Sequence, residues 1–427
     1  MADRQAWDTD ILIAGGGLAG ATLALAICRL VPGYRVTVVE AFPLSGDPAP
    51  GDYQPSYDAR STALSWGSRQ IFERLGLWPS ISAQAAAIRH IHVSEKGRFG
   101  VTRLDASDHQ QPALGYVADN RWLGLCLMES LAQQPDIHWL APAQAEGVTS
   151  LQGGVRVMIR QDGEARSLTS RCLVVADGGR SGLREALGIG IQKEDYGQYA
   201  LIANVSTEQP HQGVAWERFT ERGPMALLPQ VGGPEDGHRS ALVWTLSPAD
   251  LEEVLALDEA GRCARLQQVF GWRLGRFTRF GESHHYPLAL TTANECVRPG
   301  VALVGNAAHA LHPVAGQGFN LALRGLMALV EAFRFARDND MPPGDLRVLE
   351  RYRQQHAPDQ QQTIGFSDSL IRLFGGGYPA LGPVRNAGLA GLDIVPGAKH
   401  WFARRAMGVA AGGPSRPSSD RDREHWQ

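Results

Sequence analysis

Apolar and polar residues are arranged along the chain in blocks that predict strands followed by helices. Near the start, the apolar run Ile11–Ile13 predicts a buried strand, and Leu23, Ile27 and Leu30 recur behind it at helical spacing. The next apolar run, "RVTVVE", predicts a second strand that ends at Glu40. A strand, a helix and a strand in this order form a βαβ unit, which predicts a parallel sheet and an α/β fold.

Two further apolar strands end in glycine pairs. The run from Cys172 to Ala176 is followed by Asp177-Gly178, and the run at 300–304 is followed by Gly305-Asn306. An Asp-Gly pair behind a strand is often only a turn. Three strand ends marked by glycine in one chain nevertheless predict one nucleotide that is contacted from three sides.

The first of these strand ends has the spacing GxGxxG, formed by Gly15, Gly17 and Gly20 between strand and helix. Gly15 makes the turn, Gly17 lets a pyrophosphate approach the helix N-terminus, and Gly20 lets the helix pack on the strand. Glu40, twenty positions beyond the last glycine, can accept hydrogen bonds from ribose hydroxyls. This pattern predicts a dinucleotide site, but it does not separate FAD from NAD.

A helix with Ala322, Leu326 and Leu329 on one face begins behind the turn "HPVAGQGFN". Its glycines predict that backbone approaches something flat or charged. The middle of the chain differs, because "VAWERF" and "SALVWTL" read as strands of another sheet. The tail 411–427 is polar and rich in proline and serine, which predicts disorder.

Composition narrows the function. With 427 residues the chain is too long for one core, and a net charge of −3 argues against a general binder of nucleic acid. Five cysteines without a CxxC pair argue against a zinc site or a disulfide framework. His309 and His312 lack a matching carboxylate motif, so we predict no metal. No apolar run is long enough to span a bilayer, and we predict a cytoplasmic protein.

The three motifs, in this order, resemble those of the class A flavoprotein aromatic hydroxylases over residues 8–410. Within that family, "DARSTALS" and "HPVAGQGFNL" resemble the ubiquinone-biosynthesis hydroxylases. The stretches "WERFTERGPMALLP" and "FGWRLGRFT" resemble the 2-polyprenyl-6-methoxyphenol hydroxylases most. The chain departs from the family at Asn306, where an aspartate is usual, and at Ala322 and Gly325 behind "GFN".

The resemblance implies an FAD site and a flavin environment for oxygen. Pro313 and Gly316 would lie in the flavin and oxygen environment, and no catalytic base is assigned. The residues that the motifs imply for FAD binding are Gly15, Gly17, Gly20, Glu40, Arg60, Arg121, Asp177, Gly178, Gly305, Asn306, Gly318, Phe319 and Asn320.

The implied fold is a doubly wound, Rossmann-like FAD domain from 1–75, 100–190 and 285–345. A β-sheet substrate domain would take 76–99 and 190–290, followed by a helical C-terminal segment at 346–410. The implied activity is hydroxylation of a polyprenyl methoxyphenol in ubiquinone biosynthesis, with NAD(P)H and O₂ as co-substrates of an FAD-dependent monooxygenase. The ring position, the prenyl length and the oligomeric state stay open.

Other readings are another ubiquinone-pathway or phenol hydroxylase, an NAD-binding dehydrogenase, or a non-catalytic FAD-binding scaffold of a ubiquinone-biosynthesis complex. A flavin halogenase would need a WxWxIP-like motif, which is absent from the sequence. Residues 397–409 place Lys399 and Arg404 beside Trp401, so this segment either packs on the FAD domain or makes a weak peripheral contact with the membrane or with a partner protein.

Overall fold

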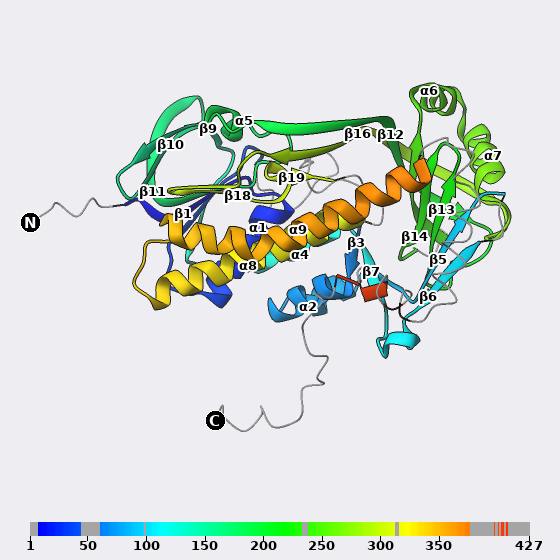
Figure 1. The fold of residues 1–427 in the computed structure, drawn as a ribbon, viewed down its shortest axis with the longest axis horizontal. Coiled ribbons are helices and arrows are strands. Elements are labelled where there is room, and N and C mark those ends of the chain that lie inside the picture. The colour runs from blue at the N-terminus through cyan, green and yellow to red at the C-terminus, as the bar shows by residue number, and fades with distance from the viewer. Residues whose placement is uncertain are drawn as a thin grey trace, which may run out of the picture.

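A computed structural model describes residues 7–43, 60–97, 100–232, 238–311 and 316–375, together with six positions between 397 and 408. Three sheets form the framework (Figure 1). The first sheet has the order β17-β18-β11-β1-β2-β8, and the hairpin β9-β10 extends it beside β11. Its strands are β1 (Thr9–Ala14), β2 (Val36–Val39), β8 (Ile137–Leu140), β9 (Gln144–Leu151), β10 (Gly154–Gln161), β11 (Glu164–Val175), β17 (Val297–Arg298) and β18 (Val301–Leu303).

The central strands of this sheet run parallel, as the βαβ pattern predicts. Ile11 of β1 pairs with Cys172 on one side and with Val36 on the other, and Leu173 pairs with Val301. One face is covered by α1 (Leu18–Leu30) and α8 (Gln317–Asp338), whose apolar residues form one buried cluster with β1 and β2. Burial on both faces explains why these strands are apolar throughout.

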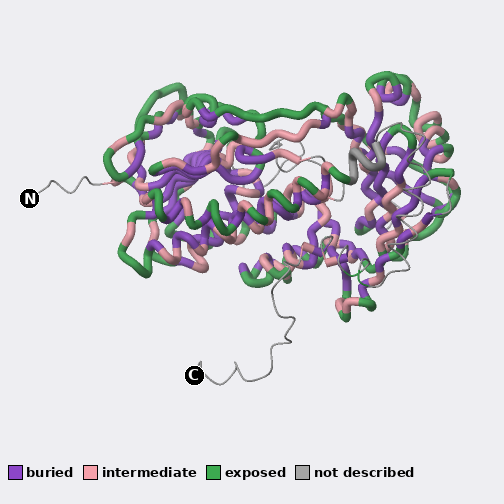
Figure 2. The backbone as a smooth tube through the Cα atoms, viewed as in Figure 1, coloured by how far each residue is buried: buried purple, intermediate pink, exposed green. Residues whose placement is uncertain are grey.

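The second sheet has the order β19-β16-β12-β15-β14-β13-β5-β6. Its strands are β5 (His90–Glu95), β6 (Val101–Asp105), β12 (Ile191–Thr207), β13 (Val214–Thr220), β14 (Gly223–Pro229), β15 (His238–Leu246), β16 (Phe277–Ala293) and β19 (His309–Ala310). Helices α6 (Pro248–Ala256) and α7 (Glu259–Phe270) pack on one face of it. The long strands β12 and β16 pair with each other and connect the two sheets. Much of this connection is exposed to solvent (Figure 2).

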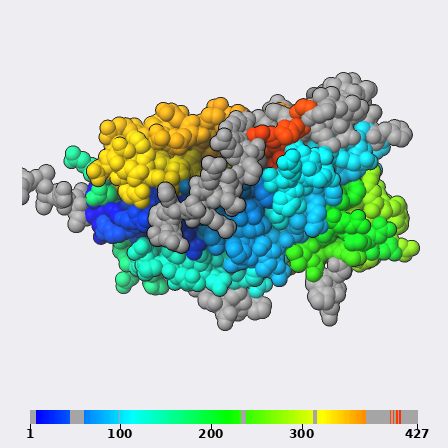
Figure 3. Space-filling view, turned by 90° about the horizontal axis from the view of Figure 1, so that it is seen from below, coloured from blue at the N-terminus to red at the C-terminus, as the bar shows by residue number. Residues whose placement is uncertain are grey.

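A third sheet of three strands was not expected. It consists of β3 (Ser61–Ser65), β7 (Gly115–Asp119) and β4 (Ala85–Ile88), flanked by α2 (Trp66–Arg74), α3 (Trp78–Ser82) and α4 (Asn120–Ala132). Seen from below, the blue and cyan surface of this region lies between α8 and the second sheet (Figure 3). The segment that we assigned to the substrate domain at 76–99 is therefore divided. Leu77 and Ile81 are buried in the core of the first sheet, whereas β5 and β6, up to Asp105, join the second sheet.

The remaining described helices are α5 (Gly182–Ala186) and α9 (Leu346–Gly375). Helix α9 runs along α8 and then reaches β13 and β14 of the second sheet (Figure 1). It accounts for the first half of the helical segment predicted at 346–410. The tail 411–427 and most of 397–409 lie outside the described residues.

Candidate active site

The three glycine-marked strand ends meet at one edge of the first sheet. Strands β1, β11 and β18 are parallel neighbours, so their carboxyl ends lie side by side, where α/β sheets bind ligands. A Cβ added to Gly15 would come within 2.5 Å of the carbonyl oxygen of Ala176, and one added to Gly305 would touch Ala19. The first, second and third motifs are therefore packed against one another.

Glycine is needed at this edge for different structural reasons at different positions. Gly15 has φ +103°, Gly178 has φ +90° and Gly305 has φ +57°, all in the left-handed region that suits glycine. A side chain at Gly20 would overlap the carbonyl oxygen of Gly15, because α1 crosses β1 there. At Gly178, by contrast, an added Cβ would meet no protein atom within 4 Å. That space is open toward the strand ends, and a bound cofactor fits it.

Glu40 lies behind the glycine loop, as predicted. Its side chain is buried, and its two carboxylate oxygens accept hydrogen bonds from the backbone N–H groups of Gly16, at 2.5 Å, and Phe42, at 3.0 Å. These bonds hold the carboxylate at the end of β2 and anchor the loop. A carboxylate oxygen can accept more than one hydrogen bond, so ribose hydroxyls remain within its chemistry.

Asp177 and Arg184 shape the second motif. Burial raises the pKa of Asp177, and its Oδ1 atom is buried without a hydrogen-bond partner among the described residues. Arg184 is 3% exposed and donates to the carbonyl oxygens of Gly179 and Ala307. It thereby fastens the second motif to the third. Asn306 is exposed at this edge, and the carbonyl oxygen of Asn306 lies 4.0 Å from an added Cβ at Gly179.

The turn before α8 forms a second part of the site. Gly316 caps the helix with φ +60°, and its added Cβ would lie 3.1 Å from the Cβ of Ala63 in β3. No side chain caps the first turn of α8, and an added Cβ on Gly318 would meet nothing within 4 Å. Free backbone N–H groups at a helix start attract a negative or electron-rich ligand, so this opening fits the flavin ring. Pro313 lies outside the described residues.

Asn320 fastens the turn before α8 to the third sheet. Its Oδ1 atom accepts from the backbone N–H of Ser65 and from Ser68 Oγ, and its Nδ2 atom donates to the carbonyl oxygens of Ala63 and Gly316. These four bonds use the whole capacity of the side-chain amide. The side chain therefore ties α8 to β3 and α2, while the backbone N–H of Asn320 makes the first helical hydrogen bond of α8.

Two arginines flank this turn. The guanidinium carbon of Arg60 lies 5.2 Å from the centre of the Tyr286 ring, so Arg60 connects the start of β3 with β16 of the second sheet. Arg121 is exposed on the first turn of α4, next to Asn120, whose backbone N–H donates to the carbonyl oxygen of Arg60. Both arginines are thus near the turn, although neither is part of the glycine-marked edge.

His309 and His356 form a buried pair that the sequence did not reveal. Their ring centroids are 5.7 Å apart, and neither ring nitrogen of His309 has a hydrogen-bond partner among the described residues. Burial lowers the pKa of His309 to about 3 and that of His356 to about 4. Both imidazoles are therefore neutral at physiological pH. Among the residues that the structure describes, no group of histidine, cysteine and acidic residues could hold a metal ion.

Comparison with known proteins decides the family. Residues 8–366 match the family model described as an FAD binding domain. The chain belongs to the FAD-dependent monooxygenases. This confirms the predicted class A flavoprotein family, with FAD as cofactor and NAD(P)H as co-substrate.

Among curated relatives of this monooxygenase, "Ubiquinone hydroxylase UbiL" of Rhodospirillum rubrum is 34% identical over 408 residues, covering 96% of this chain and 91% of the relative. The "3-demethoxyubiquinol 3-hydroxylase" of Escherichia coli is 30% identical over 404 residues, covering 94% and 99%. The crystal structure of p-nitrophenol 4-monooxygenase PnpA from Pseudomonas putida matches the fold with a TM-score of 0.74 at 18% identity, covering 93% of this chain and 98% of that one. No described helix of this monooxygenase is long and apolar enough to cross a membrane.

Proposed function

We propose that this monooxygenase hydroxylates the ring of a polyprenyl phenol in ubiquinone biosynthesis. The substrate class is taken from the two relatives named above, which are a ubiquinone hydroxylase and a demethoxyubiquinol hydroxylase. The observation that carries the proposal is a face of the second sheet that is apolar yet partly open, and that is directed toward the start of α8.

The two faces of this sheet differ in burial. Leu201, Leu242 and Trp244 point to one face and are buried beneath α6 and α7. Their neighbours Ile202 and Val243 point to the opposite face and are only partly buried. An apolar face that water still reaches fits a ring and a prenyl tail, because their burial there would be favourable.

The open face is directed toward the FAD part of the site. Gln230, beyond the end of β14, donates to Ser61 Oγ and Asp119 Oδ1 of the third sheet. Leu228 and Ala215 pack in one cluster with Ala63, the residue that touches Gly316 at the turn. A ring held on this face would therefore lie between β13–β15 and the start of α8.

The chain's own residues would hold FAD and exclude water. The loop at Gly15 and Gly17 would bind the pyrophosphate of FAD, and the carboxylate of Glu40 would bind its ribose. Asp177 and Asn306 would contact the part of FAD between the pyrophosphate and the flavin ring. Backbone N–H groups of Gly318 and Phe319 would stabilise negative charge on the ring, and Asn320 would hold this turn in place. Bound FAD supplies reduction by NAD(P)H and the activation of O₂ for transfer of one oxygen atom. Arg60 and Arg121, at the edge of the turn, would close the site toward solvent.

The narrower resemblance, to the 2-polyprenyl-6-methoxyphenol hydroxylases, is part of this proposal. The relatives named above act at different steps by their names, so another ring position in the same pathway is the second candidate. A non-catalytic FAD-binding scaffold is the third. Contact of residues 397–409 with a membrane or a partner protein is a separate proposal about how a hydrophobic substrate reaches the enzyme.

The test uses purified protein loaded with FAD. NAD(P)H consumption should rise when a prenylated methoxyphenol is added, and a product one oxygen atom heavier should form. Deletion of the gene in its host, followed by mass analysis of the accumulating quinone precursor, would assign the ring position. A yellow protein that consumes no NAD(P)H with any phenol would favour the scaffold.

A further inference from the structure

Glu217 places a carboxyl group on the open face of the second sheet. Glu217 is the fourth residue of β13, a central strand between β14 and β5. Its neighbours in the chain point to the other side. Trp216 meets Phe270 of α7 edge to face, with ring centroids 5.9 Å apart, and Arg218 Nε donates to the carbonyl oxygen of Val269. Since side chains alternate along a strand, Glu217 points away from α7.

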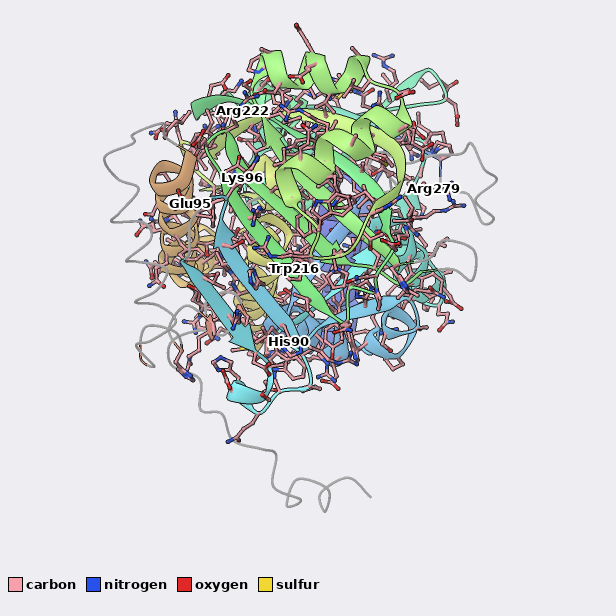
Figure 4. The ribbon with its side chains drawn as sticks, turned by 90° about the vertical axis from the view of Figure 1, so that its right-hand side faces the viewer. His90, Glu95, Lys96, Trp216, Arg222 and Arg279 are labelled. Carbon is pink, nitrogen blue, oxygen red and sulfur yellow. The ribbon has the colours of Figure 1, made fainter. Side chains whose placement is uncertain are left out.

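Figure 4 looks onto the outer face of this sheet, with Trp216 labelled on β13 and α6 and α7 in front of the strands. Strand β5 runs beside β13 from His90 to Glu95 (Figure 4). By alternation along β13, Glu217 points to the opposite side of the sheet, which packs on Ala63 of the third sheet through Ala215 and Leu228.

The cross-strand neighbours of Glu217 are apolar, and Glu95, two residues along β5 from Val93, is buried on the same face. The register places Val93 beside it on β5 and Ala226 beside it on β14, and the same row continues through Val243 and Ile202. Along β13, Ala215 packs with Ala63 and Trp66, and Phe219 is buried against Val93. The row reaches a titratable group again only at His284, four strands away on β16.

No described residue pairs with this carboxyl group. Glu217 makes no ion pair and no hydrogen bond with the described residues, and burial raises its pKa to about 8. An apolar side chain of similar size would cover the sheet without that desolvation cost. Taken as a whole residue, Glu217 is only partly buried. A polar group held among apolar cross-strand neighbours without a described partner is typical of a ligand site.

We propose that the Glu217 carboxyl group binds the phenolic hydroxyl of the substrate and thereby orients the ring on the open face. This inference rests on the proposed function. The substrate offers one hydroxyl and an apolar remainder, and the face offers this carboxyl group among Val93, Ala226, Val243 and Ile202. At neutral pH the carboxyl group is largely protonated, so it can donate to the phenol oxygen and accept from the phenol hydrogen.

The experiment compares two ligands and three variants of the FAD-loaded enzyme. The ligands are a methoxyphenol with one prenyl unit, which stays in solution, and its methyl ether, which lacks the hydroxyl group. The variants are Glu217→Leu, Glu217→Gln and, as a control, Glu282→Leu at an exposed position on β16 of the same sheet. Binding is measured from the change in the flavin absorption spectrum. The coupling of NAD(P)H oxidation to hydroxylation is measured from the hydroxylated product and the H₂O₂ formed per NAD(P)H consumed.

Wild type should bind the phenol roughly ten-fold more tightly than the ether, the ratio expected for one hydrogen bond. Glu217→Leu should remove this preference and divert NAD(P)H oxidation toward H₂O₂. Glu217→Gln should restore both, because an amide also donates and accepts. Glu282→Leu should match wild type.

The inference is overturned if Glu217→Leu keeps the preference for the phenol and the coupling of wild type. It is also overturned if Glu217→Leu weakens the binding of the phenol and the binding of the ether equally, since that result indicates that Glu217 only packs against the ligand. Failure of the proposed function has a separate sign, because wild type itself would then neither bind nor hydroxylate the phenol.

Discussion

The edge of the first sheet and the open face of the second sheet recognise their ligands by different means. At the edge, the groups available to a ligand are mostly backbone: glycine turns, helix starts and the loop anchored by Glu40. On the open face they are side chains, set by alternation along β13–β15 and by the register between strands. Backbone recognition constrains short stretches of sequence, whereas side-chain recognition is spread over strands far apart in the chain.

Two glycines at the edge test whether space is reserved for backbone or for a ligand. Gly20→Ala would force a Cβ onto the carbonyl oxygen of Gly15, and we expect it to destabilise the protein by about 3 kcal/mol or to prevent folding. At Gly318, at the start of α8, an added Cβ meets no atom of the described residues, so the apoprotein with Gly318→Ala should keep or gain up to about 1 kcal/mol of stability. The same substitution should nevertheless weaken FAD binding by about 1–3 kcal/mol, because the added methyl group would crowd the cofactor.

Urea unfolding of the two apoproteins and titration with FAD measure both effects. Equal loss of stability in the two variants would contradict the distinction. Full FAD affinity in Gly318→Ala would show that the opening before α8 is not filled by the cofactor.

Arg184 tests whether the edge acts as one unit. Replacing it by leucine leaves the carbonyl oxygens of Gly179 and Ala307 without their donors, which costs about 2–3 kcal/mol of folding free energy. FAD affinity should fall as well, because the second and third motifs separate. Glu185→Leu, at an exposed position of the same helix, is the matched control and should change neither quantity. A variant Arg184→Leu with normal FAD affinity would mean that each motif is held independently.

The same contrast explains what could be predicted from the sequence. The strand ends at Ala14, Val175 and Leu303 were found because each carries its motif within a few residues, and the helix behind Gly316 was found from its apolar spacing. Glu217 lay inside a recognised strand, but its sequence does not show that its neighbours across the sheet are apolar. The side-chain contacts of Asn320 were not visible for a related reason, since its partners Ala63, Ser65 and Ser68 are more than 250 positions away.

The third sheet was missed altogether. Its strands β3, β4 and β7 are only four or five residues long. In the chain they alternate with segments that belong to the FAD domain or to the substrate domain. Short strands of this kind carry little periodicity. The burial of Leu77 and Ile81 against the first core is likewise a long-range contact, which the pattern within 76–99 does not show.

The histidine pair extends the comparison to a region that neither ligand touches in our proposal. His309 and His356 are held neutral, with pKa values of about 3 and about 4, while an unfolded chain takes up their protons near pH 6.5. The unfolded state therefore binds more protons below pH 6.5, so stability should fall as the pH is lowered from 6.5 toward 4. Each histidine contributes a slope of about 1.4 kcal/mol per pH unit within that window.

His309→Leu should reduce this slope by about one histidine's share, because leucine cannot titrate and the ring nitrogens have no described partner to lose. Urea unfolding at pH 8, 6 and 5 measures it, and the pH 8 value separates the packing effect from the titration. An unchanged slope in the variant would mean that His309 gains its proton in the folded protein as readily as in the unfolded one.

The smallest expected effect concerns Asn306, where a side chain meets the backbone-built edge. Asn306→Asp is nearly isosteric, and the residue is exposed at the strand ends, so folding and FAD binding should be kept. The added negative charge disfavours the reduced, more negative flavin, and the flavin potential should fall. For an exposed charge the effect is below about 1 kcal/mol. Dye equilibration of the FAD-loaded protein measures the potential at low and high salt, and the shift should shrink with salt. A potential that rises in Asn306→Asp would contradict this electrostatic argument. An unchanged potential would place the side chain beyond electrostatic reach of the flavin, and the third motif would then act through its backbone alone, like the first.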